Sequence, residues 1–212
     1  FFILLLKNIT YIFFPVNKSI LIDSRKTLHR FNFKEEPVLV RLDPDEVLLL
    51  TLNQSKTVDG LLVQLKRDNV IGRHDAASLL LEHLSYPEVK KMLKRSALYD
   101  KSWFVRRSSL QSISSELIGK EWKFAYKREK HSQPRKTIIS LMSELYPNIA
   151  LELIRENLHK DKSYIVQAEM INQLGLIGDE SDILIIEKML PERSPRKIIQ
   201  KAAKTSIANL KG

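Results

Sequence analysis

A basic and aromatic segment, residues 120–136 (KEWKFAYKREKHSQPRK), carries the most distinctive chemistry in the sequence. It holds seven Lys or Arg residues against two Glu, with aromatic rings at positions 122, 124 and 126. Cations beside aromatic faces suit phosphate contact and base stacking. The predicted contact patch consists of Trp122, Lys123, Tyr126, Lys127, Arg128 and Arg135. The favoured alternative is a helix whose rings pack inward while its Lys and Arg side chains stay in solvent.

Arginine and aspartate recur at the starts of helical segments, which favours a structural role over ligand binding. Arg73, Arg106 and Arg107 stand at such starts. We expect these arginines to form a ladder by pairing with an aspartate of a neighbouring helical hairpin. The candidate partners are Asp68, Asp100 and Asp161. Asp100 and Asp161 also precede apolar stripes, where a carboxylate can cap free amide groups.

No residue set in the sequence predicts catalysis or metal binding. The histidines are His29, His74, His83, His131 and His159, and no pair has zinc spacing with a Glu between its members. The absence of cysteine excludes disulfides, thiolate zinc sites and cysteine nucleophiles and leaves the compartment open. Nucleophile-elbow, Walker and dinucleotide motifs are also missing. We therefore expect no catalytic residue and no cofactor in this chain.

Composition indicates a folded chain with a basic surface. Of its 212 residues 43% are hydrophobic and 28% charged, and the net charge is +10. Such a charge attracts phosphate, but a solvated basic surface is the favoured interpretation. The apolar start, residues 1–14, is interrupted by Lys7 and Asn8 and falls short of the roughly 20 residues of a membrane span. It predicts a buried strand rather than a signal or anchor, so no membrane partner is expected. The first residue, Phe, suggests a fragment or a trimmed chain.

Residues 1–52 are predicted to be a β segment. Short runs rich in β-branched and aromatic residues occupy positions 11–16, 19–23, 28–33 and 37–42. Turn-like breaks separate them at 17–18, 24–26 and 34–36. Asp43-Pro44 can then start a helix whose buried face is residues 47–50.

From about residue 57 the apolar pattern has the helical period of 3.6 and repeats. Every second helix is predicted to begin near Val70, Trp103, Gln133, Tyr164 or Arg196. Aligned positions 71, 105, 135, 166 and 199 differ by 34, 30, 31 and 33 residues. A near-constant period with two helices per unit is typical of an α-solenoid. The prediction is therefore a mainly α fold, with about five HEAT-like helical hairpins in residues 53–212 after the β segment of residues 1–52.

Two kinds of motif carry a family resemblance. Residues 100–113 (DKSWFVRRSSLQSI) and 161–179 (DKSYIVQAEMINQLGLIGD) resemble HEAT repeats. Residues 13–52, ending in VRLDPDEVLLLTL, resemble the end of the β-sandwich domain of aminopeptidase N-type gluzincins. Residues 59–84 (DGLLVQLKRDNVIGRHDAASLLLEHL) are similar to the first helical pair that follows in the bacterial branch.

This resemblance implies the C-terminal helical region of a zinc aminopeptidase, without its H-E-x-x-H motif. Such a region would close over the active-site cleft and limit peptide access, and the zinc would lie in the parent enzyme. Its implied partners are the catalytic domain of that enzyme and the peptide substrate. Two alternatives stay open: a HEAT protein that binds nucleic acid, like the alkylpurine DNA glycosylases, and a protein-interaction scaffold. For the first, Asp100 between Tyr99 and Trp103 is the one loose candidate residue.

Overall fold

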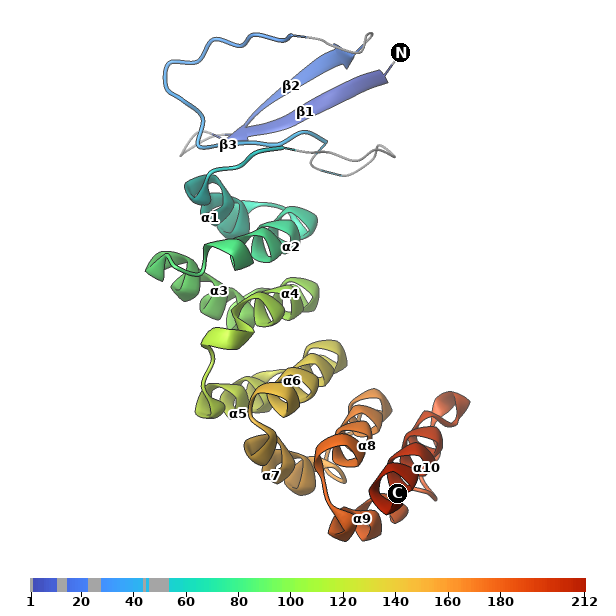
Figure 1. Cartoon of the computed structure of the whole chain (residues 1–212). Coiled ribbons are helices and arrows are strands. Elements are labelled where there is room, and N and C mark those ends of the chain that lie inside the picture. The colour runs from blue at the N-terminus through green and yellow to red at the C-terminus, as the bar shows by residue number, and fades with distance from the viewer. Residues whose placement is uncertain (1, 11–14, 23–27, 44, 46–53) are drawn as a thin grey trace. The chain divides into compact units, whose positions relative to one another are not determined.

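The structure is a computed structural model that describes residues 2–10, 15–22, 28–43, 45 and 54–212. It is mainly helical, as predicted, with a small sheet at the N-terminal end (Figure 1). The chain divides into two compact units, Phe1–Leu93 and Lys94–Gly212, called unit 1 and unit 2 below. None of the helices within the described residues is long and apolar enough to cross a membrane.

The sheet in unit 1 has three antiparallel strands in the order β2-β1-β3. They are β1 (Phe2–Thr10), β2 (Pro15–Ile22) and β3 (Leu39–Val40). Phe2 lies opposite Ile22, and the register shifts between Leu6 and Ile9, where the polar Lys7-Asn8 pair interrupts the apolar run. Ile20 is buried, and Phe31, Val40 and Leu42 pack against it. The strand predicted in residues 1–14 is therefore confirmed over β1.

Several details of the predicted β segment are wrong. Residues 28–33 are in no strand of the described sheet, and Leu28 leaves 77% of its surface exposed. The break expected at 17–18 lies inside β2. Lys18 pairs with Leu6 of β1, and Asn17 lies between the paired residues Val16 and Lys18. The run 37–42 contributes only the two residues of β3. The turn at 24–26 and the helix face at 47–50 lie outside the described residues.

Ten α-helices follow within residues 54–212, where no strand occurs. They are α1 (Val58–Arg67), α2 (Val70–Leu79), α3 (Pro87–Tyr99), α4 (Trp103–Ile113), α5 (Gly119–Arg128), α6 (Ser132–Leu145), α7 (Pro147–Asn157), α8 (Tyr164–Ile177), α9 (Ile183–Glu187) and α10 (Ile198–Lys211). Four single-turn 3₁₀ segments accompany them: Leu80–His83, Ser114–Glu116, Glu180–Asp182 and Pro195–Lys197. The predicted starts of α2, α4 and α8 are confirmed to the residue.

Local chemistry sets the helix boundaries. The Thr57 and Asn69 side chains accept hydrogen bonds from amides in the first turns of α1 and α2, as N-caps do. α10 starts at Ile198 rather than at Arg196, because Arg196 and Lys197 have φ angles of 52° and 56°. A right-handed helix cannot run through such left-handed residues.

In unit 1 the sheet and the first helices pack together. β3 contacts α1, and a Cβ added to Gly60 would lie 2.8 Å from the carbonyl oxygen of Val38. The two chain segments approach so closely that only a glycine fits at position 60. The predicted change from strand to helix at residues 52–53 falls outside the described residues, and the sheet does not form a compact unit of its own.

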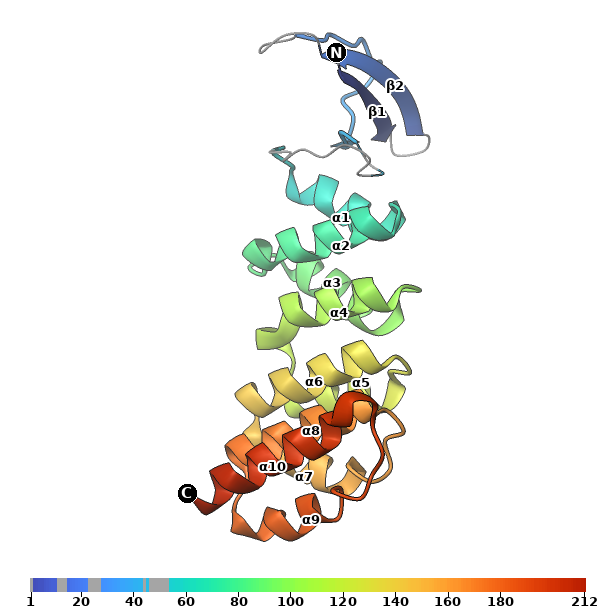
Figure 2. The same cartoon turned by 90° about the vertical axis from the view of Figure 1, so that its right-hand side faces the viewer.

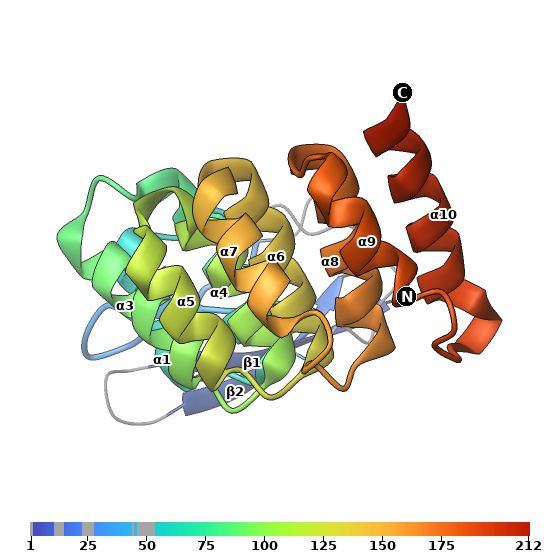
Figure 3. The same ribbon diagram turned by 90° about the horizontal axis from the view of Figure 1, so that it is seen from below.

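Unit 2 has two layers of helices. α4, α6, α8 and α10 follow one another along its concave side, and α5, α7 and α9 form the convex layer (Figures 1 and 3). α6 contacts α4, α5, α7 and α8, and α8 also contacts α10. The side chains between the layers are fully buried, among them Leu110, Ile138, Ile139, Met142, Ile154 and Met170. The apolar stripes of the sequence are thus buried within unit 2.

Candidate functional site

The predicted basic and aromatic patch does not form a surface on which bases could stack. Trp122 is fully buried and Tyr126 only 7% exposed, whereas Phe124 is 50% exposed. Positions 122 and 126 of α5 share one helical face, and that face packs into the core. The alternative of inward-packed rings is the one that the structure supports.

The hydroxyl of Tyr126 has a structural partner. It donates a hydrogen bond of 2.7 Å to Oδ2 of Asp161. Burial, reinforced by this bond to a carboxylate, raises the pKa of Tyr126 well above its ordinary range. Tyr126 therefore ties α5 to the loop before α8.

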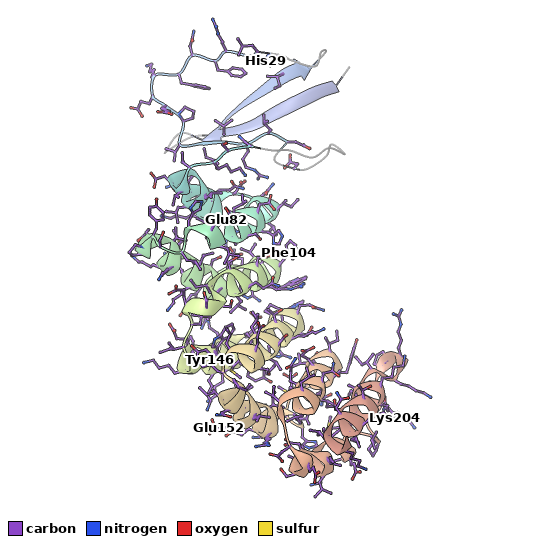
Figure 4. All side chains as sticks on the ribbon, viewed as in Figure 1. His29, Glu82, Phe104, Tyr146, Glu152 and Lys204 are labelled. Carbon is purple, nitrogen blue, oxygen red and sulfur yellow. The ribbon has the colours of Figure 1, made fainter. Side chains whose placement is uncertain are left out.

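Three of the four cations in the patch are also engaged. Lys123 pairs with Glu152, which lies on α7 on the convex side (Figure 4). The guanidinium of Arg128 lies over the Tyr99 ring, 4.3 Å from its centroid. Arg135 binds a carboxylate, as described below, and Lys127 is exposed. The six residues thus serve different contacts and do not make up one binding site.

Unit 2 contains a ladder of arginine–acid pairs, but the pairs differ from those predicted. Nε and Nη2 of Arg106 donate to the two carboxylate oxygens of Glu129 at 2.6 and 2.7 Å. Nη1 of Arg106 donates to the carbonyl oxygen of Asp100 at 2.9 Å. Arg106, in the first turn of α4, therefore binds both the loop before α4 and Glu129, the acid before α6.

Arg135 repeats this arrangement one helix pair further on. Its Nε and Nη2 donate to the two oxygens of Asp161, both at 2.9 Å, and its Nη1 donates to the carbonyl oxygen of Lys130 at 2.7 Å. The side chains of Glu129 and Asp161 are only 5% and 4% exposed. Each also accepts from an amide two residues ahead, at His131 or Ser163. These are therefore buried ion pairs that cap helices, rather than open sites.

Unit 1 contains a related pair that the sequence prediction missed. Arg41 binds Asp68 at 2.7 Å, with both side chains at least 95% buried, and Nη1 of Arg73 donates to the carbonyl oxygen of Asp68 at 2.8 Å. The predicted role of Arg107 is wrong, because none of the ion pairs found in the described residues includes it and its buried Nε lacks a hydrogen-bond partner there. The intervals of 29 and 32 residues between Asp100, Glu129 and Asp161 could have revealed the ladder, had Glu been admitted beside Asp.

The glycosylase-like candidate has ordinary structural contacts. Oδ1 of Asp100 accepts from the amide of Ser102 at 2.8 Å, which is a capping arrangement. The Trp103 ring stacks on His131 with a centroid distance of 4.4 Å and an interplanar angle of 2°. Nδ1 of His131 accepts from the amide of Gln133. Within the described residues no group of three or more His, Asp or Glu side chains could hold a metal ion.

One hollow of unit 2 lies between α6, α8 and α10, and we call it the inner groove. It is open to solvent and has a volume of about 410 Å³. Its apolar lining comes from Ile165, Ala168, Ile198 and Ala202, and its polar lining from Lys136, Glu169, Asn172, Lys201 and Thr205. These residues have no motif, because they come together only when three helices pack.

Glu169 is the central polar residue of the inner groove. Its residue surface is 9% exposed, and its Oε1 accepts a hydrogen bond of 2.8 Å from Gln173 on the same helix. Oε2 lies 3.6 Å from Nζ of Lys136 on α6. An amide (Asn172), a hydroxyl (Thr205) and a second amine (Lys201) stand around this pair over apolar side chains. Such a groove offers donors, acceptors and apolar contact to a linear polar ligand.

No protein-family model matches the chain, and no curated protein sequence matches it either.

Proposed function

We propose that this chain is a HEAT-like α-solenoid of about five helical hairpins and the non-catalytic C-terminal region of a zinc aminopeptidase. In this role it closes over the active-site cleft of the parent enzyme and limits access to peptides. The order of the elements supports the proposal, since a small sheet precedes α1 and helices alone follow. The near-constant spacing of α2, α4, α6, α8 and α10, the second helix of each proposed hairpin, supports the solenoid. Zinc belongs, in this proposal, to the catalytic domain of the parent enzyme.

The observation that carries the proposal is the inner groove. An extended peptide presents alternating amide donors and carbonyl acceptors, which Asn172 and Thr205 can satisfy from one side. The apolar side chains of Ile165, Ala168, Ile198 and Ala202 can cover a side chain of the peptide. Lys201 can attract a carboxylate. Concave faces of helical repeats are suited to such elongated ligands.

Peptide binding to the whole chain tests this role. The probe is a fluorescein-labelled ten-residue peptide without secondary structure and with a free carboxyl end, followed by fluorescence anisotropy. Asn172→Ala and Lys201→Ala should each weaken binding by about 5- to 10-fold, the loss of roughly one hydrogen bond or ion pair of about 1–1.5 kcal/mol. Lys204→Ala is the matched control, since Lys204 is exposed on the same helix, α10, and does not line the groove (Figure 4).

Equal binding by the wild type and both groove variants would reject the groove as the peptide contact. The assignment to an aminopeptidase has its own test in the gene. An H-E-x-x-H motif encoded upstream in the same reading frame supports it, and a complete reading frame without that motif refutes it.

A further inference from the structure

Positive charge gathers along one edge of unit 2, where the loops lead into α4, α6, α8 and α10. Figure 2 shows these four helices beginning on the same side. The exposed cations within four residues of the helix that follows define what we call the basic edge: Lys101, Lys130, Lys160, Lys162, Arg196 and Lys197. The loops at the other ends of these helices, residues 114–118, 145–146 and 178–182, contain no Lys or Arg and four acids. Asp179 and Asp182 among these acids bind Arg155, so the contrast between the two edges lies in the exposed cations.

The loops of the basic edge are held next to one another by contacts already described. The Arg106–Glu129 pair and the Trp103–His131 stack join the loop before α4 to the loop before α6. The Arg135–Asp161 pair joins that loop to the loop before α8. Neighbouring packed helices lie about 8–10 Å apart, so the cations form a row with that step.

The acids within this row do not neutralise it. Glu129 and Asp161 are buried beneath it and already bound to arginines, the partly buried Asp100 accepts from the Ser102 amide, and Glu192 is exposed. None of the six cations forms an ion pair with a side chain in the described part of the chain. The helix dipole alone favours cations where α5, α7 and α9 end. The six cations can nevertheless still attract a linear polyanion.

Exposed tyrosines stand among the cations. Tyr99 and Tyr164 are 54% and 41% exposed, beside the loops before α4 and α8. A hollow of about 330 Å³ opens beside Tyr99, Arg128 and Lys130. The large apolar side chains that unit 2 exposes elsewhere, such as Ile118, Leu145 and Leu176, follow or precede other loops. A row of cations with tyrosines and without aliphatic side chains suits a nucleic acid better than a membrane surface.

We propose that the basic edge binds single-stranded nucleic acid, a property independent of the peptide role proposed above. The lysines of successive loops contact phosphates of the strand, and bases stack on Tyr164 and on the face of Tyr99 opposite Arg128. A single strand fits because its bases are free to reach the tyrosines, whereas those of a duplex are paired and stacked. Binding of this kind is insensitive to base sequence and weakens with salt, because counterions are released from the phosphates.

The test is fluorescence anisotropy of a labelled 20-nucleotide oligothymidine with the whole chain at several salt concentrations. The double variant Lys130→Ala/Lys162→Ala should weaken binding by at least about 10-fold at 0.1 M salt and lower the slope of log K against log salt by about 1.4, since each lost phosphate contact removes about 0.7. Tyr99→Ala should weaken binding about 5-fold or more through lost stacking. Circular dichroism checks that each variant is folded.

The control removes the same charge elsewhere. Lys120→Ala/Lys204→Ala takes two exposed cations from outside the basic edge and should change the affinity less than 2-fold. Equal losses in the two double variants would overturn the proposal in favour of general attraction. So would tighter binding of poly-glutamate than of oligothymidine, which indicates an acidic peptide, or binding of vesicles with 30% phosphatidylserine but not of oligothymidine, which indicates a membrane.

Discussion

Replacement of Arg106 by Ala tests whether the ladder stabilises unit 2. The pair is well formed, with two hydrogen bonds of 2.6 and 2.7 Å between side chains that are 16% and 5% exposed. Arg106→Ala leaves the Glu129 carboxylate buried without its counter-charge, a loss that typically costs about 3–5 kcal/mol of unfolding free energy. Glu129→Gln keeps the shape and an acceptor oxygen, so we expect a smaller loss of about 1–3 kcal/mol.

The pH dependence of stability provides a second test of the Arg106–Glu129 pair. Burial alone would raise the pKa of Glu129, but hydrogen bonds from Arg106 and from the amides of His131 and Lys130, together with the charge of Arg106, outweigh it and lower that pKa. A lowered folded-state pKa stabilises the protein above the ordinary carboxyl range, near pH 4.5, and this stability is lost as the pH falls through the folded-state value. In Arg106→Ala the effect of burial prevails and raises the pKa of Glu129. The difference in unfolding free energy between variant and wild type should therefore shrink as the pH falls from 7 to 4.

Urea denaturation followed by circular dichroism at 222 nm at pH 7, 5 and 4 measures both effects. Lys123→Ala is the control, because the Lys123 and Glu152 side chains are 39% and 60% exposed and such a pair contributes less than about 1 kcal/mol. A loss in Arg106→Ala no larger than in Lys123→Ala would refute the reasoning. So would a deficit that stays constant from pH 7 to pH 4.

Three further outcomes are expected. Leu174→Ala, at a fully buried position, should cost about 2–5 kcal/mol in urea denaturation, whereas Leu184→Ala, at a position 68% exposed, should stay within about 0.5 kcal/mol; similar losses would show that the core is misassigned. Gly175→Ala places a Cβ 2.6 Å from the Cα of Ser206, so α8 and α10 must separate and the thermal midpoint should fall by several degrees; an unchanged midpoint contradicts this close packing. The isolated chain should bind no zinc and cleave no aminoacyl amide, and stoichiometric zinc after dialysis with chelator-sensitive activity would contradict that.

Periodicity predicted the helices well because each helix buries one stripe of its own residues. The stripe at Leu110 and Ile113, for example, needs only the period of 3.6 and an apolar neighbour, and both residues are fully buried. The strands were predicted less accurately, since a strand depends on a distant partner. Leu28–Phe33 has the composition of a strand but no strand pairs with it among the described residues, so its composition decided nothing.

The sequence by itself determined the mainly helical fold, the starts of α2, α4 and α8, and the recurring acid before each of several second helices, because these follow from local periods and caps. Only the tertiary structure decided which arginine meets which acid, since the two lie 23 and 26 residues apart at Arg106–Glu129 and Arg135–Asp161. It also decided that Trp122 faces the core, and that Glu169, Lys136 and Lys201 share a groove. The physical reason is that the environment of a helix face depends on which neighbouring helices pack on it. The spacing of residues within one helix does not predict those neighbours.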